Sequence, residues 1–231
     1  GSYNDAVINA LKNCGIVYAR TTRTTMGFEL PADFLAWHPT CHHKDAPELA
    51  KRFMEEGRLY KNILIPTIMS NMGLFKFAEE NGISCYPTKV GDRYVLESLL
   101  KLNASLGGEQ SGHIIIPEYM TTGDGELSAL MLIESMKLSG KKASELKKVM
   151  RVYPQVMVNI EATPEMKAKL DDPEVKSYLD IETRRLEGDG RILVRPSGTE
   201  PLIRIMIEGS DEKFINDLVN ECAETLKNLL N

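Results

Sequence analysis

The densest group of chemically capable residues in the chain is RPSGTEP, which runs from Arg195 to Pro201. A Pro-Ser-Gly-Thr turn exposes backbone N–H groups and two hydroxyls, and Arg195 precedes it while Arg204 follows it. Guanidinium groups form strong paired hydrogen bonds with phosphate oxygens. The stretch therefore predicts a phosphate-binding loop. Its spacing alone fits an ordinary hairpin turn with solvated arginines equally well.

A second group, Glu109, Ser111 and His113, alternates within the glycine-rich segment GGEQSGH. In an extended segment, residues two apart face the same way, so a carboxylate, a hydroxyl and an imidazole would share one face. Such groups suit the paired hydroxyls of a sugar, and the glycines would let a ligand approach the backbone. The residues alone also fit a bulged strand with Glu109 exposed and His113 in the core. A serine nucleophile with His113 as its base is a third, less favoured reading.

One further group has the side chains of zinc ligands: His38, Cys41, His42 and His43. Adjacent histidines cannot easily reach one ion, and neither a second cluster nor an acidic partner completes the set. We interpret this segment as a polar loop and expect no metal site in the chain.

The elements that must position these groups alternate along the middle of the chain. Apolar runs predict three short strands, at 63–65, 83–86 and 114–116. Helical spacing predicts four helices, at 45–57, 70–80, 93–102 and 125–138. Such alternation is typical of βα units on a mixed, largely parallel sheet, whose strand ends carry ligand-binding loops.

The last part of the chain has a different pattern. Strands are predicted at 155–162, 191–194 and 202–207, and helices at 164–170, 173–186 and 211–230. This composition predicts a small α+β domain. We therefore expect an atypical segment over 1–44, a remnant or a linker, then an α/β domain over 45–150 and a smaller α+β domain over 151–231.

Composition narrows the possible partners. The 231-residue chain has a net charge of −5, which argues against a nucleic acid or an anionic membrane as its main partner. No apolar run approaches the roughly 18 residues of a membrane span. The four cysteines lack CxxC spacing, as is typical of reduced proteins. We expect a cytoplasmic protein, whose open sheet edges could permit self-association.

Longer segments around the two loops resemble those of a known family. RPSGTEPLIRIMIEG is similar to the C-terminal phosphate-binding loop of the α-D-phosphohexomutases, and GGEQSGHIII is similar to their sugar-recognition loop. The form GEQSGH, together with TKVGDRYV at 88–95 and TTGDG at 121–125, most resembles the branch that acts on glucosamine phosphates. The resemblance covers about 45–231.

The resemblance implies a role for each group. Glu109 and Ser111 would hold the hydroxyls of a phosphorylated hexosamine or hexose, and His113 would support their loop. Asp92 and Arg93 would lie beside the reacting centre. The substrate phosphate would be held by Arg195, Ser197, Gly198, Thr199 and Arg204.

Two motifs of the family do not occur in this sequence: the phosphoserine loop of the type T-A-S-H-N-P and the DGDGDR loop that holds Mg²⁺. Without them, phosphoryl transfer lacks its main charge stabilisation, so the resemblance implies a chain that is inactive alone and a full-length enzyme that uses Mg²⁺. We predict a C-terminal portion of an isomerase that interconverts glucosamine 6-phosphate and glucosamine 1-phosphate. The alternative is a truncated, non-catalytic relative that binds a phosphosugar or a protein partner.

Overall fold

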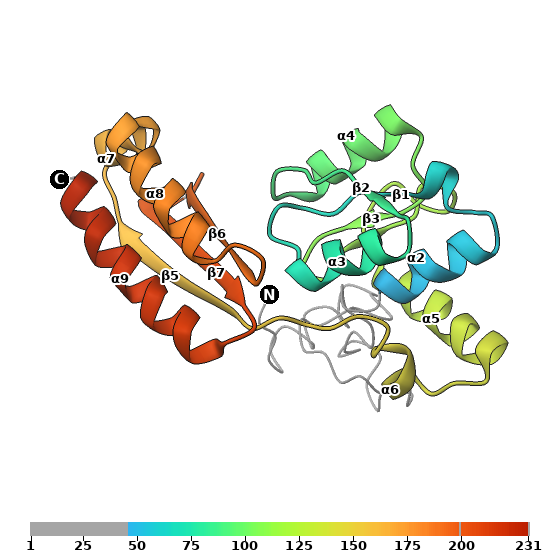
Figure 1. The fold of residues 1–231 in the computed structure, drawn as a ribbon. Coiled ribbons are helices and arrows are strands. Elements are labelled where there is room, and N and C mark those ends of the chain that lie inside the picture. The colour runs from blue at the N-terminus through green and yellow to red at the C-terminus, as the bar shows by residue number, and fades with distance from the viewer. Residues whose placement is uncertain (1–45, 199, 231) are drawn as a thin grey trace, which may run out of the picture. The chain divides into compact units, whose positions relative to one another are not determined.

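The computed structural model describes residues 46–198 and 200–230, which divide into two compact units (Figure 1). Among these residues, unit 1 comprises 46–70 and 74–151, and unit 2 comprises 71–73 and 152–230. The predicted atypical segment 1–44 and its histidine and cysteine cluster lie outside the described residues.

Unit 1 combines short strands with helices. A parallel pair of strands, β1 and β2, is joined through a parallel bridge between Ile65 and Gly107 to an antiparallel pair, β3 and β4. The strands therefore run in both directions, as expected for a mixed sheet. The elements in chain order are α2 (Ala46–Glu55), η3 (Tyr60–Asn62), β1 (Ile63–Leu64), α3 (Met72–Glu80), β2 (Ser84–Cys85), α4 (Asp92–Leu102), β3 (Gly107–Gly108), β4 (Ile114–Ile115), α5 (Gly125–Ser139) and α6 (Ala143–Leu146).

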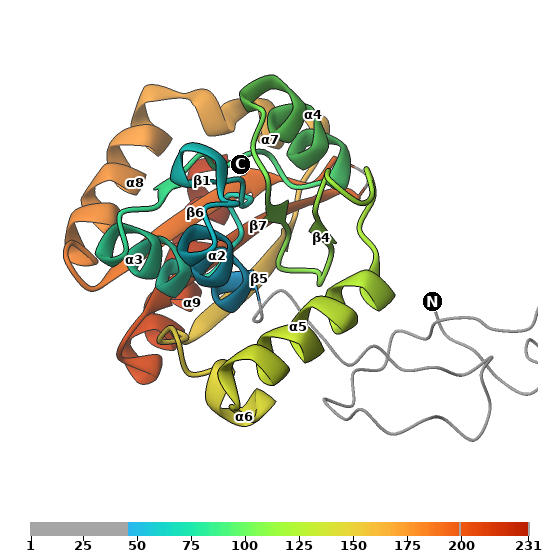
Figure 2. The ribbon, with the colours of Figure 1, turned by 90° about the vertical axis from the view of Figure 1, so that its right-hand side faces the viewer.

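Both faces of β1 and β4 are covered, which explains the continuous apolar run in β4. Ile114 packs in a cluster with Phe53 of α2, whereas Ile115 packs in a second cluster with Val95 and Leu99 of α4. Figures 1 and 2 show α4 on one side of the strands and α2 with α5 on the other. A strand buried on both faces has no polar alternation, so its sequence is uniformly hydrophobic.

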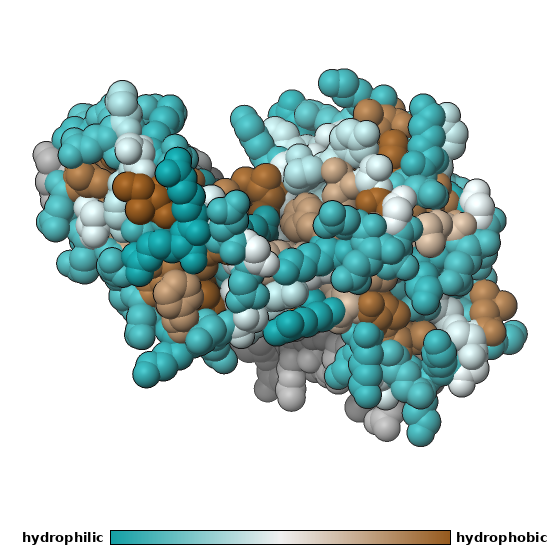
Figure 3. Space-filling view, viewed as in Figure 1, coloured by the Kyte–Doolittle hydropathy of each residue, from teal (hydrophilic) through white to brown (hydrophobic). Residues whose placement is uncertain are grey.

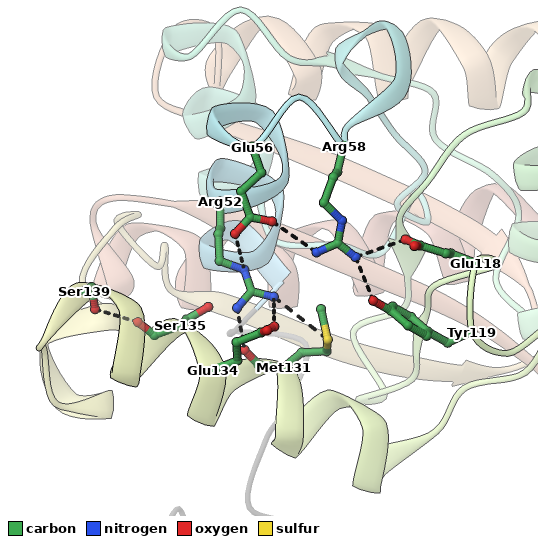
Figure 4. A network of polar contacts seen from close by, with 9 residues as sticks. All are labelled: Arg52, Glu56, Arg58, Glu118, Tyr119, Met131, Glu134, Ser135 and Ser139. Atoms are coloured by element: carbon green, nitrogen blue, oxygen red, sulfur yellow. Dashed lines mark hydrogen bonds and ion pairs between the residues drawn. The ribbon is translucent and has the colours of Figure 1, made fainter.

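A buried arginine fixes α2 against α5 (Figure 4). The Nη1 of Arg52 donates to the main-chain oxygen of Met131 at 3.1 Å, and its Nη2 lies 3.0 Å from the Glu134 carboxylate. Its side chain is only 7% exposed, so the ion pair and the hydrogen bond offset its desolvation.

Unit 2 has a three-stranded antiparallel sheet in the order β5-β7-β6. Ile203, Ile205 and Ile207 pack into the core that α9 completes, so the alternate residues of β7 belong to the opposite face. The α8 helix packs against β6 and α9 (Figure 1). The elements are β5 (Gln155–Glu161), α7 (Pro164–Ala168), η4 (Lys169–Asp171), α8 (Pro173–Arg185), β6 (Gly190–Pro196), β7 (Leu202–Gly209) and α9 (Glu212–Leu230).

The described residues on the face drawn in Figure 3 are mainly polar. In the face seen in Figure 3, hydrophobic side chains form scattered groups among polar ones on each unit. None of the helices in the described part of the chain combines the length and the apolar character that a membrane-spanning helix needs.

Candidate functional site

The segment GGEQSGH forms a tight turn between β3 and β4. The main-chain N–H of Glu109 donates to the carbonyl of His113 at 2.9 Å, and that of Gly112 donates to the carbonyl of Glu109 at 3.1 Å. Glycine suits position 108 because a Cβ there would lie 2.6 Å from the His113 carbonyl oxygen. The expectation of an extended segment is therefore wrong, since the two short strands close into a hairpin.

The turn nevertheless gathers the three predicted side chains. The Ser111 hydroxyl donates to Oε1 of Glu109 at 3.2 Å, and the main-chain N–H of Gly91 donates to Oε2 at 3.0 Å. The Nδ1 of His113 lies 2.9 Å from the Asp92 carboxylate and 3.8 Å from Oε1 of Glu109. We call Asp92, Glu109, Ser111 and His113 the turn cluster.

Burial differs sharply within the turn cluster. The Glu109 side chain is 8% exposed, whereas those of His113 and Asp92 are 35% and 41% exposed. The reading with Glu109 exposed and His113 in the core is thus wrong. Burial raises the pKa of Glu109, and the adjacent Asp92 carboxylate raises it further. Because Nδ1 of His113 is held by Asp92, Nε2 is the ring nitrogen left for a ligand.

The turn cluster also has the donor types of a metal site. Ligand atoms of Asp92, Glu109 and His113 all lie within 4.8 Å of one another. Mg²⁺, however, prefers an octahedral shell of oxygen ligands that includes several waters. An imidazole that already contacts one of the carboxylates does not fit that preference, so we assign no Mg²⁺ to the turn cluster.

Arg93 does not join the turn cluster. Its side chain is 84% exposed, and its Nε donates to Glu97 one turn further along α4 at 2.8 Å. Of the two residues expected beside the reacting centre, the structure brings Asp92 together with Glu109, Ser111 and His113 and leaves Arg93 exposed.

In unit 2, RPSGTEP closes the hairpin between β6 and β7. The main-chain N–H of Ser197 donates to the carbonyl of Leu202 at 2.8 Å, and that of Leu202 donates to the carbonyl of Glu200 at 2.8 Å. The Ser197 side chain is buried and accepts from the Glu200 N–H at 3.2 Å. Thr199 lies outside the described residues.

A polar row crosses the sheet beside this loop. Arg195 of β6 is the register partner of Arg204 in β7, and Arg204 also pairs with Asn159 of β5. Residues directly opposite each other in antiparallel strands point to the same face. We call Asn159, Arg204 and Arg195 the arginine row, which adds an asparagine that sequence reasoning did not select.

The arginine row places two like charges side by side. Burial lowers the pKa of Arg195, and the positive charge of Arg204 lowers it further. The Nε atoms of both arginines are buried, and neither has a hydrogen-bond partner among the described residues. Donors of this kind are costly when unpaired and favour a bound anion.

Known proteins match the chain over both units. Residues 48–153 match the phosphoglucomutase/phosphomannomutase alpha/beta/alpha domain III, and residues 140–225 match the C-terminal domain of the same family. The chain belongs to this family, the α-D-phosphohexomutases. The family predicted from the two loops is thereby confirmed.

Two phosphohexomutases illustrate the similarity. The phosphoglucosamine mutase of Caldicellulosiruptor saccharolyticus is 50% identical over 183 residues, which cover 79% of this chain and 41% of that protein. The phosphoglucosamine mutase of Clostridium botulinum, strain Kyoto, is 48% identical over 179 residues, which cover 77% of this chain and 40% of that protein. The chain thus spans about 40% of the length of these relatives.

A solved phosphohexomutase has the same fold. The structure of Aspergillus fumigatus N-acetylphosphoglucosamine mutase in complex with GlcNAc-6P and magnesium aligns with a TM-score of 0.66 and 17% identity. The alignment covers 81% of this chain and 43% of that one. The predicted fold class, an α/β domain with a mixed sheet followed by a smaller α+β domain, is confirmed.

One residue that supports the phosphohexomutase loop was missed by sequence reasoning. The Lys167 ammonium, on α7, donates to the main-chain oxygens of Ser197 at 2.9 Å and Glu200 at 2.6 Å. Lys167 lies 30 residues before Ser197, so no local motif connects them. Only the sheet order could have indicated it, because α7 follows β5 and β5 neighbours β7.

Proposed function

We propose that the chain is the sugar- and phosphate-recognising C-terminal portion of a phosphohexomutase that interconverts glucosamine 6-phosphate and glucosamine 1-phosphate. The arginine row beside RPSGTEP carries this proposal, because its two adjacent cations have buried donors that lack partners among the described residues. A phosphorylated hexosamine is the fitting ligand class, since a phosphate suits the loop of unit 2 and hydroxyls suit the turn cluster of unit 1. Curated relatives of about 50% identity that are named phosphoglucosamine mutase support the choice of sugar.

The turn cluster would recognise the sugar. Glu109 accepts hydrogen bonds, and the Ser111 hydroxyl both donates and accepts them. Because Asp92 holds Nδ1 of His113, Nε2 is the ring nitrogen that can form a hydrogen bond with the sugar. A sugar hydroxyl likewise donates and accepts, so the mixed character of the turn cluster matches it. Asp92 would act near the reacting centre by holding the imidazole. Arg93, being exposed, would have to move to take part.

The loop of unit 2 would hold the phosphate. The guanidinium groups of Arg195 and Arg204 supply charge and paired donors, and the Ser197 hydroxyl supplies a neutral donor. By resemblance to the family, Gly198 and Thr199 would add their groups to the same phosphate. Such a site recognises the charge and geometry of the phosphate and needs no contact with the sugar.

We further propose that this chain binds the phosphosugar without turning it over. The T-A-S-H-N-P and DGDGDR motifs do not occur in its sequence, so neither a phosphoserine nor the magnesium loop is available to stabilise a transferring phosphoryl group. Mg²⁺ would belong to the full-length family enzyme, where it would supply that charge stabilisation.

Calorimetric titration of the chain with glucosamine 6-phosphate, and separately with glucose 6-phosphate, tests the proposal. We expect weak binding by the wild type, loss of binding in Arg195→Ala, and a smaller preference for the amino sugar in Glu109→Ala. Arg184→Ala and Glu79→Ala are matched controls, because they remove the same charges from exposed positions on α8 and α3. A folded wild type that binds neither phosphosugar at low salt would contradict the proposed function.

A further inference from the structure

Glu200, within RPSGTEP, contacts the same groups that are proposed to hold the phosphate. Its Oε2 forms an ion pair with Nη2 of Arg204 and lies 3.4 Å from the Ser197 hydroxyl, which can donate to it. Two phosphate-binding donors, one charged and one neutral, therefore face a carboxylate of the loop itself.

The Glu200 carboxylate is placed so that it can exchange its contacts with Arg204 and Ser197 for contacts with water. Its side chain is 49% exposed, so water can take over its hydrogen bonds when it rotates away. Its backbone, in contrast, is held at both ends: the N–H donates to Ser197 Oγ at 3.2 Å, and the carbonyl accepts from Lys167 at 2.6 Å. The loop can thus keep its form while this one side chain changes position.

Glu200 neutralises only one side of the arginine row. Arg195 forms no ion pair among the described residues, and its buried Nε lacks a partner there, whereas Arg204 pairs with Glu200. An incoming phosphate would meet one arginine that is open and one that already holds an anion.

We propose that Glu200 is a built-in competitor for the phosphate, which lowers the affinity of the loop for its ligand. This inference rests on the proposed function and concerns the affinity of the same loop for phosphate. A carboxylate that stayed would lie within a few ångströms of a phosphate dianion and repel it, and one that left would give up its bonds to Arg204 and Ser197. Either way, phosphate binds less tightly than the two arginines alone would allow.

The substitution Glu200→Gln separates competition from positioning. Glutamine keeps the length of the side chain and an acceptor for Arg204, but it removes the negative charge. If Glu200 competes, the variant binds phosphate more tightly, by about five- to tenfold at fixed ionic strength. If Glu200 instead orients Arg204 for the ligand, the variant binds more weakly.

Titrations with inorganic phosphate and with glucosamine 6-phosphate, near pH 7.5 so that the ligands are mainly dianions, measure the change. Glu212→Gln is the matched control, because it removes one exposed carboxylate at the start of α9, beyond the end of β7 that lies away from the loop. Arg195→Ala in the Glu200→Gln background reports whether the tighter binding occurs at the arginine row.

The outcomes are distinct. Tighter binding of both ligands by Glu200→Gln, with Glu212→Gln unchanged and the gain removed by Arg195→Ala, supports the inference. Unchanged or weaker binding by Glu200→Gln, while the wild type binds, overturns it and leaves the proposed function standing. Absence of binding by folded wild type and Glu200→Gln alike overturns the phosphate loop and the inference together.

Discussion

Replacing Lys167 with methionine should weaken phosphate binding although Lys167 is not expected to contact the phosphate. Its ammonium donates to the main-chain oxygens of Ser197 and Glu200, so it joins the two ends of the loop that the arginine row flanks. Methionine keeps the aliphatic stem and removes only these two hydrogen bonds and the charge. The variant loop would have to order itself when the phosphate binds, at a cost to affinity.

The size of the effect follows from the two hydrogen bonds. Hydrogen bonds from a charged group contribute about 1.5 to 3 kcal/mol each, but the one to the Glu200 carbonyl is exposed and counts for less. The sheet already restricts the motion of the loop, so only part of this energy should be lost. We expect the binding free energy to weaken by about 1 to 2 kcal/mol, which is roughly a 5- to 30-fold rise in Kd. Calorimetric titration with glucosamine 6-phosphate measures it.

Lys169→Met provides the matched control for this prediction. Lys169 is two residues away and also donates to a main-chain oxygen, that of Leu230 at 2.9 Å, so its loss removes the same charge and one similar bond. It should lower the thermal stability of unit 2 and leave phosphate affinity within twofold. The reasoning is refuted if Lys167→Met loses stability without losing affinity, or if both variants lose affinity equally.

Three further predictions concern unit 1 and its turn cluster. A Cβ at Gly123 would lie 2.8 Å from that of His113, so Gly123→Ala should displace the imidazole, reduce sugar preference in titrations and shift the His113 ring signals in NMR spectra. Because burial and Asp92 raise the pKa of Glu109, the folded state holds this proton more tightly than the unfolded chain does. The free energy of unfolding should therefore fall as the pH rises from the ordinary carboxyl range through the raised pKa. Glu109→Gln should flatten this pH dependence in denaturant titrations. Phe53→Ala, at a fully buried position, should cost about 3 to 5 kcal/mol in urea unfolding.

The sequence was sufficient for most of the helices and strands and for the family of the chain. Apolar runs marked β1 and β4 because these strands are buried on both faces, and helical spacing marked α2, α4 and α9 because each packs one face against a core. RPSGTEP could be recognised as a motif of the family because its residues are adjacent in the sequence: the arginine, the serine and the turn lie within seven residues.

What the sequence did not yield depends on contacts between distant segments. Strand alternation predicted that Glu109, Ser111 and His113 share a face, and they do gather, but through a turn whose hydrogen bonds no alternation rule contains. Lys167 and Asn159 reach the loop only because β5 pairs with β7 in the sheet. The pairing order of strands is not encoded in the spacing of residues, so their proximity had to come from the structure.

The face of the unit 2 sheet that lies opposite the α9 core contains both apolar and charged register partners. Two residues from the arginine row along the same strands, the register partners are Met157, Met206 and Leu193, which are apolar as expected for a surface that only needs to pack. At the arginine row itself, two guanidinium groups stand next to each other although like charges opposite one another destabilise a sheet. Their buried Nε donors also lack partners among the described residues. Stability therefore does not account for arginine at both positions, whereas the proposed anionic ligand would.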